Sequence, residues 1–229
     1  MNIYFAGTPN SAAEILKSLA LNDLFSIKGV ITQPDKKGKR GNQRIESPVS
    51  LMAKSLNLQT FKPHNLAKEE IQNDFDITNA DVLVVVAYGN LIPTWILESN
   101  IKAINIHYSL LPSYRGASPI QSSLLNNDKK TGVTFMQMSE DLDAGKVIKC
   151  FEVPINNNDN KSSLEKKLTK LSILNLEKVI KKKGNWYLYE NEKIAYGKDK
   201  AKFYLLENPV IATEISNRVY GTIKVQNND

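Results

Sequence analysis

The stretch DVLVVVAYG, residues 81–89, constrains the fold more than any other part of this sequence. It holds an uninterrupted apolar run in which no polar residue alternates with the valines. A strand of this kind is typical of a parallel sheet whose two faces are both covered by helices. The run is also far shorter than the roughly 20 apolar residues that a membrane-spanning helix needs. We therefore expect the chain to fold around a central, fully buried β-strand.

Strands and helices alternate along the chain on both sides of this run. The pattern predicts further strands at 2–7, 26–32, 101–107, 132–138 and 146–153, and helices at 9–21, 47–56, 65–74, 119–125 and from 162 onward. Such alternation is typical of an α/β fold with a Rossmann-type, mainly parallel twisted sheet. The turn after the first strand reads Gly7-Thr8-Pro9 and not G-x-G-x-x-G, so a dinucleotide site is not indicated.

The C-terminal part of the sequence predicts a long helix followed by a small β element. Ser162 and Glu165 form the S-x-x-E pattern of a capping box, and Gly184 is a typical helix end. The next residues, NWYLYENEKIAYG, alternate bulky and polar side chains and predict a β-hairpin, with a short strand after it. We therefore expect one main domain over 1–184 and a short hairpin tail over 185–229.

Composition and charge narrow the possible environment and partners. The 229 residues carry a formal net charge of +6, which favours anionic partners such as a nucleotide or a nucleic acid. A biased genome would explain the many lysines equally well. The first residues lack the basic and apolar regions of a signal peptide. The single cysteine, Cys150, cannot form an internal disulfide, which suits a reducing cytoplasm. A cytoplasmic protein without a membrane partner is expected.

Asn105 and His107 end the predicted strand at 101–107, and His107 is one of only two histidines. Residues two apart on a strand point to the same face, and open α/β sheets bind ligands at the carboxyl ends of their strands. An amide beside an imidazole suits acyl transfer, because the amide can stabilise an oxyanion while the imidazole moves a proton. For these two residues alone, a strand-end histidine bonded to backbone is the commoner explanation.

Asp143 lies 36 residues after this histidine, in the segment LDAG. The following glycine, Gly145, permits a tight backbone, so Asp143 can approach the same pocket and set the tautomer of the imidazole. An isolated Asp-x-Gly segment is more often only a turn. Two histidines and one cysteine offer no metal-ligand spacing, so no metal site is expected.

The segment NIHYSLLPSYRGASPIQ, residues 105–121, together with the later LDAG resembles the formyltransferases that use 10-formyltetrahydrofolate. The resemblance extends over roughly residues 1–180. It implies that a substrate amine attacks the formyl carbon on N10 of this cosubstrate, that His107 and Asn105 stabilise the oxyanion, and that Asp143 orients the imidazole. It also implies a cis bond between Leu111 and Pro112. The folate pocket implied by the resemblance is formed by Tyr88, Gly89, Leu91, Ser139, Glu140 and Leu142.

Two segments resemble the methionyl-tRNA formyltransferases within this family most closely. They are FAGTPNSA and the basic segment TQPDKKGKRGNQRIESPV, residues 32–49, which contains five basic and two acidic residues. In the tRNA enzymes this loop meets the acceptor arm, although a solvated loop without a partner is the alternative. Those enzymes usually carry Asp where Asn10 stands and a small residue where Tyr108 stands. The substrate contacts implied by the resemblance are Thr8, Pro9, Asn10, Arg40 and Tyr108.

The residues after Gly184 favour a smaller substrate. They do not indicate the five-stranded OB-type barrel with which the tRNA enzymes grip their substrate, and some sugar enzymes of the family end in a hairpin. We therefore expect a homodimer that formylates a nucleotide-linked amino sugar, such as the dTDP-4-amino-4,6-dideoxy sugars used for lipopolysaccharide O-antigen. Methionyl-tRNA is the alternative substrate. The basic loop disfavours a purine-pathway substrate, and Asn105, His107 and Asp143 disfavour a non-catalytic nucleic-acid-binding module.

Overall fold

The computed structural model describes residues 1–38, 44–66, 80–181, 186–189, 192–196 and 198–214. The chain divides into two compact units, residues 1–179 and residues 180–229. Most of the helix predicted at 65–74 and the predicted substrate residue Arg40 lie outside the described residues.

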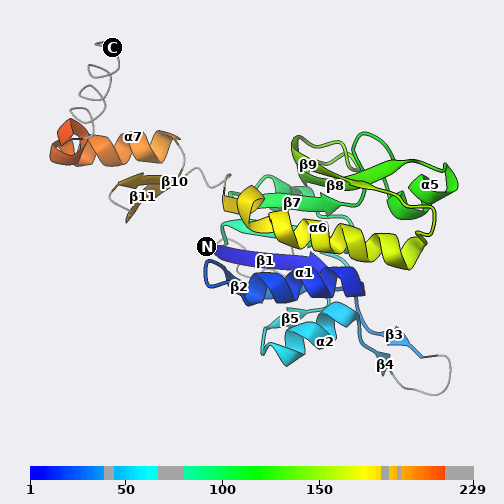
Figure 1. Ribbon diagram of the computed structural model, residues 1–229. Helices are drawn as coiled ribbons and strands as arrows, with labels where there is room; N and C mark the ends of the chain where they lie inside the picture. The colour runs from blue at the N-terminus through cyan, green and yellow to red at the C-terminus, as the bar shows by residue number, and fades with distance from the viewer. Residues whose placement is uncertain (39–43, 67–79, 182–185, 190–191, 197, 215–229) are drawn as a thin grey trace, which may run out of the picture. The chain divides into compact units, whose positions relative to one another are not determined.

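The first unit is built on a seven-stranded sheet in the order β5-β2-β1-β6-β7-β8-β9 (Figure 1). Four of its six strand pairings are parallel, and the pairings of β8 with β7 and with β9 are antiparallel. The predicted α/β fold with a mainly parallel sheet is therefore confirmed. The strands are β1 (Asn2–Gly7), β2 (Ser26–Ile31), β5 (Thr60–Phe61), β6 (Val82–Val86), β7 (Lys102–His107), β8 (Lys130–Gln137) and β9 (Val147–Pro154).

The valine-rich strand β6 lies at the centre of this sheet, between β1 and β7, and all of its residues are buried. Because side chains alternate along a strand, Leu83 and Val85 face one side and the other three residues face the opposite side. Leu83 and Val85 join an apolar cluster that also contains Tyr4 and Ala6 of β1 and Ile96. The prediction of a central strand buried on both faces is confirmed.

Helices cover both faces of the sheet. Figure 1 shows α1 and α6 side by side against one face. A hydrogen bond from Ser11 of α1 to Glu165 joins the two helices, and Asn22, just after α1, donates to Glu177 of α6. The apolar cluster that includes Ile96 covers the other face. The helices of this unit are α1 (Asn10–Ala20), α2 (Pro48–Ser55), α4 (Thr94–Leu97), α5 (Pro119–Leu125) and α6 (Lys161–Lys181). None of the helices in the described ranges is long and apolar enough to cross a membrane.

The N-terminal cap of α6 differs from the predicted one. The Ser163 amide donates to Asn160 Oδ1 at 3.0 Å, and the Asn160 amide donates to Ser163 Oγ at 3.0 Å. The predicted capping pair of Ser162 and Glu165 is wrong, because Asn160 forms this reciprocal pair two residues earlier and asparagine is at least as good a cap as serine. Glu165 instead accepts a hydrogen bond from Ser11 of α1.

A short basic ribbon lies between β2 and α2. It consists of β3 (Lys36–Lys37) and β4 (Arg44–Ile45), which pair antiparallel with Lys36 opposite Ile45 and Lys37 opposite Arg44. All four residues are exposed. The term basic ribbon is used below for these four residues.

The second unit contains β10 (Trp186–Tyr189) and β11 (Glu192–Tyr196), which pair antiparallel, and the helix α7 (Lys198–Glu207). The helix α7, and not the predicted short strand, directly follows β11, and the tail residues 215–229 lie outside the described residues. The sequence of α7, KDKAKFYLLE, is rich in the helix formers Lys, Ala, Leu and Glu, and this propensity outweighs its aromatic residues.

Candidate active site

Asn105 and His107 lie at the carboxyl end of β7, and both side chains reach Asp143. Their spacing on the strand predicts this common direction, because residues i and i+2 share one face. Asp143 itself follows β8, the neighbouring strand, in the loop that leads to β9. The three predicted catalytic residues therefore meet at one place.

The carboxylate of Asp143 is contacted by three residues from two segments, β7 and the loop that contains Gly116. Asn105 Nδ2 donates to Oδ1 at 3.1 Å, and the Gly116 amide donates to Oδ2 at 2.8 Å. His107 Nδ1 lies 3.5 Å from the same Oδ2. The side chains of His107 and Asp143 are only 7% and 9% exposed, so these contacts replace water around a nearly buried charge.

The backbone around Asp143 is unusually tight. Asp143 has a φ of +48°, in the left-handed region that L residues seldom adopt. A Cβ added to Gly145 would lie 1.8 Å from the Gln137 carbonyl oxygen, so the chain can pass here only with glycine. The role predicted for this glycine, a close backbone approach, agrees with this geometry.

Both ring nitrogens of His107 face hydrogen-bond acceptors. Nε2 lies 2.8 Å from the carbonyl oxygen of Tyr114, and Nδ1 faces Asp143. A neutral imidazole carries one N–H and an imidazolium carries two, so only the cation can donate to both oxygens. The site thus suits a histidine that gains a proton during a reaction.

Asn105 has a spare donor. Its amide nitrogen carries two protons, and the structure uses it in one described hydrogen bond, to Asp143. Asn105 and His107 both line a cavity of about 550 Å³. The second N–H of Asn105 can therefore donate to an oxygen of a bound ligand, as an oxyanion site requires.

All six residues predicted to hold the folate line this same cavity. Leu91 and Leu142 are large apolar side chains that remain mostly exposed at its wall. Exposed apolar side chains beside a few polar groups are typical of sites for flat organic ligands. The complete predicted set in the cavity wall is Tyr88, Gly89, Leu91, Ser139, Glu140 and Leu142.

The predicted substrate residues are divided. Pro9 and Tyr108 line the cavity, whereas Thr8 and Asn10 are not among the residues of its wall. The Thr8 hydroxyl donates to the Tyr88 carbonyl at 2.8 Å, so Thr8 joins β1 to the loop after β6. Asn10 is exposed at the first turn of α1. Arg40 lies outside the described residues.

Tyr108 contacts α6 with its polar end. Its hydroxyl lies 3.0 Å from Thr169 Oγ1, and burial raises the pKa of Tyr108 to about 12. The phenol therefore keeps its proton in neutral solution. Tyr108 therefore lines the cavity while its hydroxyl contacts α6.

The cavity wall also contains residues that were not predicted from the sequence, among them Ser11 of α1 and Lys161 and Glu165 of α6. Ser11 Oγ donates to Glu165 Oε1 at 2.8 Å, which fixes the carboxylate at the wall. The capping-box interpretation assigned Glu165 to its own helix end and so hid this role. Contact between residues 154 positions apart left no local signal in the sequence.

In the described part of the chain, no group of three or more His, Cys, Asp or Glu side chains is arranged to hold a metal ion. The Leu111–Pro112 bond is cis, as predicted.

The first unit matches known proteins along its length. A family model described as formyl transferase matches residues 1–180. Phosphoribosylglycinamide formyltransferase from Anaplasma phagocytophilum superposes with a TM-score of 0.65 at 22% identity, over 83% of this chain and 91% of that chain. A 4-N formyltransferase from Francisella tularensis gives 0.59 at 21%, over 79% and 67%. WlaRD, a sugar 3N-formyl transferase, gives 0.56 at 20%, over 80% and 64%. At these identities, the structures show a shared fold.

The second unit matches a different family model. Residues 175–224 match the model of the RecA C-terminal domain. The sequence predictions contained no such similarity and treated residues 185–229 as a hairpin tail.

Proposed function

Since the chain belongs to the formyl transferase family and is thus an N-formyltransferase with formyl-tetrahydrofolate as cosubstrate, we propose that its acceptor is a nucleotide-linked amino sugar. The cosubstrate supplies an electrophilic formyl carbon. In the net reaction the acceptor amine gains the formyl group, and the folate nitrogen that loses it gains a proton.

The cavity fits a folate in size and in chemistry. Its volume of about 550 Å³ lies within the range of small-ligand sites. Leu91 and Leu142 offer apolar contact for a flat ring, and Ser139 and Glu140 offer polar atoms beside it. We propose that these residues and Tyr88 and Gly89 hold the folate next to Asn105 and His107.

The three residues around Asp143 then have separate tasks. Asn105 donates its second N–H to the oxygen that becomes negative as the amine attacks. His107 moves the proton that the amine loses. Asp143 keeps both side chains oriented and compensates the positive charge that the imidazole gains.

The substrate proposal rests on the polar residues that α1 and α6 contribute to the wall of the same cavity. Lys161 supplies an ammonium and Glu165 a fixed carboxylate, both at the cavity wall with His107. An ammonium suits a phosphate oxygen, and a carboxylate suits sugar hydroxyls. A nucleotide-linked amino sugar carries phosphates, hydroxyls and an amine within one small molecule.

Methionyl-tRNA is the second candidate, because the basic ribbon exposes Lys36, Lys37 and Arg44. Exposed cations of this kind suit the phosphates of a nucleic acid backbone. The catalytic steps proposed for Asn105, His107 and Asp143 are the same for either acceptor.

A formylation assay with 10-formyltetrahydrofolate distinguishes these acceptors. The panel contains dTDP-, UDP- and GDP-linked 3-amino and 4-amino sugars, charged initiator tRNA and glycinamide ribonucleotide. We expect turnover with at least one amino sugar and little with the other acceptors. Efficient formylation of methionyl-tRNA or of glycinamide ribonucleotide, without activity on any sugar, would overturn the proposal.

Three further proposals accompany this one. We propose a homodimer, a cytoplasmic location, and a catalytic domain over residues 1–184 with residues 185–229 as a separate element. Light scattering on the purified full chain measures the oligomeric state, and a monomer at micromolar concentration would contradict the first.

A further inference from the structure

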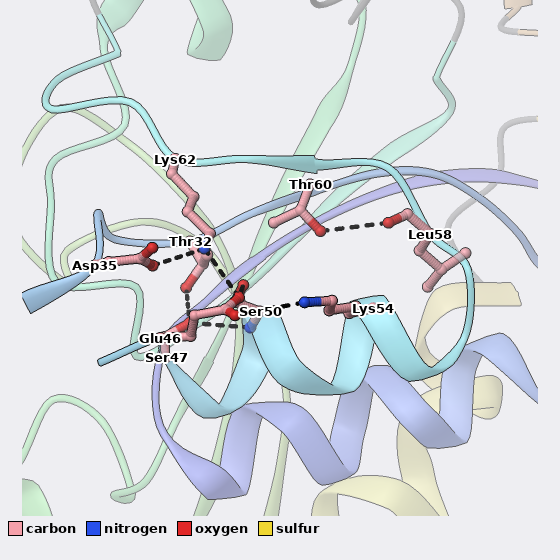
Figure 2. Close-up of polar contacts among 9 residues, drawn as sticks. All are labelled: Thr32, Asp35, Glu46, Ser47, Ser50, Lys54, Leu58, Thr60 and Lys62. Carbon is pink, nitrogen blue, oxygen red and sulfur yellow. Dashed lines mark hydrogen bonds and ion pairs between the residues drawn. The ribbon is translucent and has the colours of Figure 1, made fainter. Parts of the chain in front are cut away.

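Lys62 joins the two ends of the basic ribbon (Figure 2). Its Nζ lies 2.6 Å from Asp35 Oδ1 and 3.1 Å from Glu46 Oε2. Asp35 immediately precedes β3, and Glu46 immediately follows β4. One ammonium therefore ties together both chain segments from which the ribbon extends.

The charges in this cluster are stable around neutral pH. Partial burial acts to lower the pKa of Lys62, but the bonds to Asp35 and Glu46 outweigh it and raise that pKa above its ordinary value. A hydrogen bond from Ser50, followed by that from Lys62, holds the pKa of Glu46 below its ordinary value. Lys54 also approaches Glu46, at 3.8 Å, but its side chain is 77% exposed.

The cluster is anchored to the sheet and to α2. Ser47, next to Glu46, caps α2 by accepting a hydrogen bond from the Ser50 amide at 3.0 Å. The Thr32 hydroxyl lies 2.7 Å from Ser47 Oγ (Figure 2). The Thr32 amide donates to the Phe61 carbonyl of β5. The ends of the ribbon are thus fixed on elements of the core.

The same segments also contact the wall of the active-site cavity. Asn90 lines that cavity, and its side chain bonds on two sides. Gln33 Nε2 donates to Asn90 Oδ1, and Asn90 Nδ2 donates to the His64 carbonyl, each at 3.4 Å. Gln33 is two residues before Asp35 and His64 is two residues after Lys62, so the cluster and the cavity wall are linked through both segments.

Lys62 also affects whether the ribbon cations are paired with the two neighbouring carboxylates. Asp35 and Glu46 are the acidic residues nearest to Lys36, Lys37 and Arg44 in the sequence. Both carboxylates bind Lys62, and among the described residues neither forms an ion pair with Lys36, Lys37 or Arg44. If Lys62 lost its charge, the two carboxylates would be free to neutralise those cations and to draw the ribbon out of place.

We propose that Lys62 is a positioning residue, which holds the two ends of the basic ribbon in place and keeps its cations available for the phosphates of the acceptor. It thereby sets the affinity for the acceptor and takes no part in formyl transfer. This inference rests on the proposed phosphate-bearing acceptor.

The test compares Lys62→Met with Lys54→Met, which removes the same charge from an exposed neighbour of Glu46, and with Lys62→Arg, which keeps the charge. In Lys62→Met, the ribbon amides should exchange hydrogen about tenfold faster. Its KM for the acceptor should rise about 5-fold, while kcat and the folate Kd stay within twofold of wild type. Lys54→Met and Lys62→Arg should resemble the wild type in both measurements.

Three results would overturn the proposal: unchanged ribbon exchange in Lys62→Met, equal acceleration in Lys54→Met, or an unchanged KM. If Lys62→Met did not fold, Asp35→Asn would test the same 2.6 Å contact. Hydrogen exchange needs no acceptor, so it separates the two proposals. Faster ribbon exchange without formylation of any sugar would contradict the proposed function only, and KM would then be measured with the acceptor that is active.

Discussion

Asp143 and Lys62 are each the centre of a cluster that joins distant segments, but the clusters differ in burial and in the sign of the central charge. Asp143 is a carboxylate with a side chain only 9% exposed, and it accepts hydrogen bonds from two neutral donors, Asn105 and the Gly116 amide. Lys62 is an ammonium whose side chain is 27% exposed, and it binds two carboxylates.

This difference agrees with a chemical role for the Asp143 cluster and a positioning role for the Lys62 cluster. Around Asp143 the charge balance depends on whether His107 carries a second proton, so the cluster can respond to a reaction in the cavity. Around Lys62 all charges are fixed near neutral pH, and water screens them. Losing the first cluster should therefore abolish turnover, whereas losing the second should weaken binding.

The largest expected effect tests the first half of this comparison. His107→Ala and Asp143→Asn should each lower kcat by about 10²–10⁴-fold, because proton transfer and orientation of the imidazole are lost. The folate Kd should change little, since neither side chain supplies the apolar wall of the cavity. Steady-state formylation and titration with folate measure the two quantities. His64→Ala is the matched control, and turnover within threefold of wild type in either variant would remove that residue from the mechanism.

The next effect concerns how the Asp143 cluster is held. Gly145→Ala should lower kcat at least tenfold and also destabilise the protein, because its Cβ would lie 1.8 Å from the Gln137 carbonyl oxygen. The loop that carries Asp143 must then move. Ala144→Ser, at the exposed neighbour, is the control. A fully active Gly145→Ala variant would show that the tight backbone is not needed to place Asp143.

The sequence predicted the centre of the fold well, because its signals there are local. The valine run at 82–86 and the helix at 119–125 depend on burial and on periodicity within a few residues. The cap of α6 was predicted wrongly, because two residues near the start of this helix compete as caps, and the helix α7 was not predicted. Asn160 and Ser162 are both good caps, and the helix formers of KDKAKFYLLE were not read as a helix.

The candidate site divides in the same way. Asn105 and His107 follow from their spacing on one strand, and Asp143 follows from the motif that the resemblance supplied. Ser11, Lys161 and Glu165 were missed, because their approach depends on how α1 and α6 pack on the sheet. The link from Lys62 to the ribbon is likewise a tertiary contact between residues with no shared pattern.

A smaller effect tests whether the cations of the basic ribbon bind the acceptor. Changing Lys36, Lys37 and Arg44 together to Ser should raise KM by about tenfold at low salt, because the phosphates of the acceptor lose their cations. With a nucleotide sugar, the salt dependence of KM should change by less than about one unit of slope, since such a molecule has few condensed counterions. With tRNA, the slope should fall by about one unit for each lost phosphate contact. An unchanged KM at low salt would mean that the ribbon does not meet the acceptor.

The smallest expected effect is that of Lys62→Met on stability. The pH dependence of this effect tests whether Lys62 and Glu46 keep their charges around neutral pH. Because the pKa of Glu46 is lowered, its contribution to the stability of the folded protein is fully present above the ordinary pKa of 4.5. This contribution is lost as the pH falls through the lowered pKa. Because the pKa of Lys62 is raised, its contribution to stability is fully present below the ordinary pKa of 10.5. This contribution is lost as the pH rises through the raised pKa. Lys62→Met should therefore lower Tm by about 2 °C, by the same amount at every pH between about 5 and about 10. A Tm difference that varied with pH inside that range would show that the charges of the Lys62 cluster are not fixed.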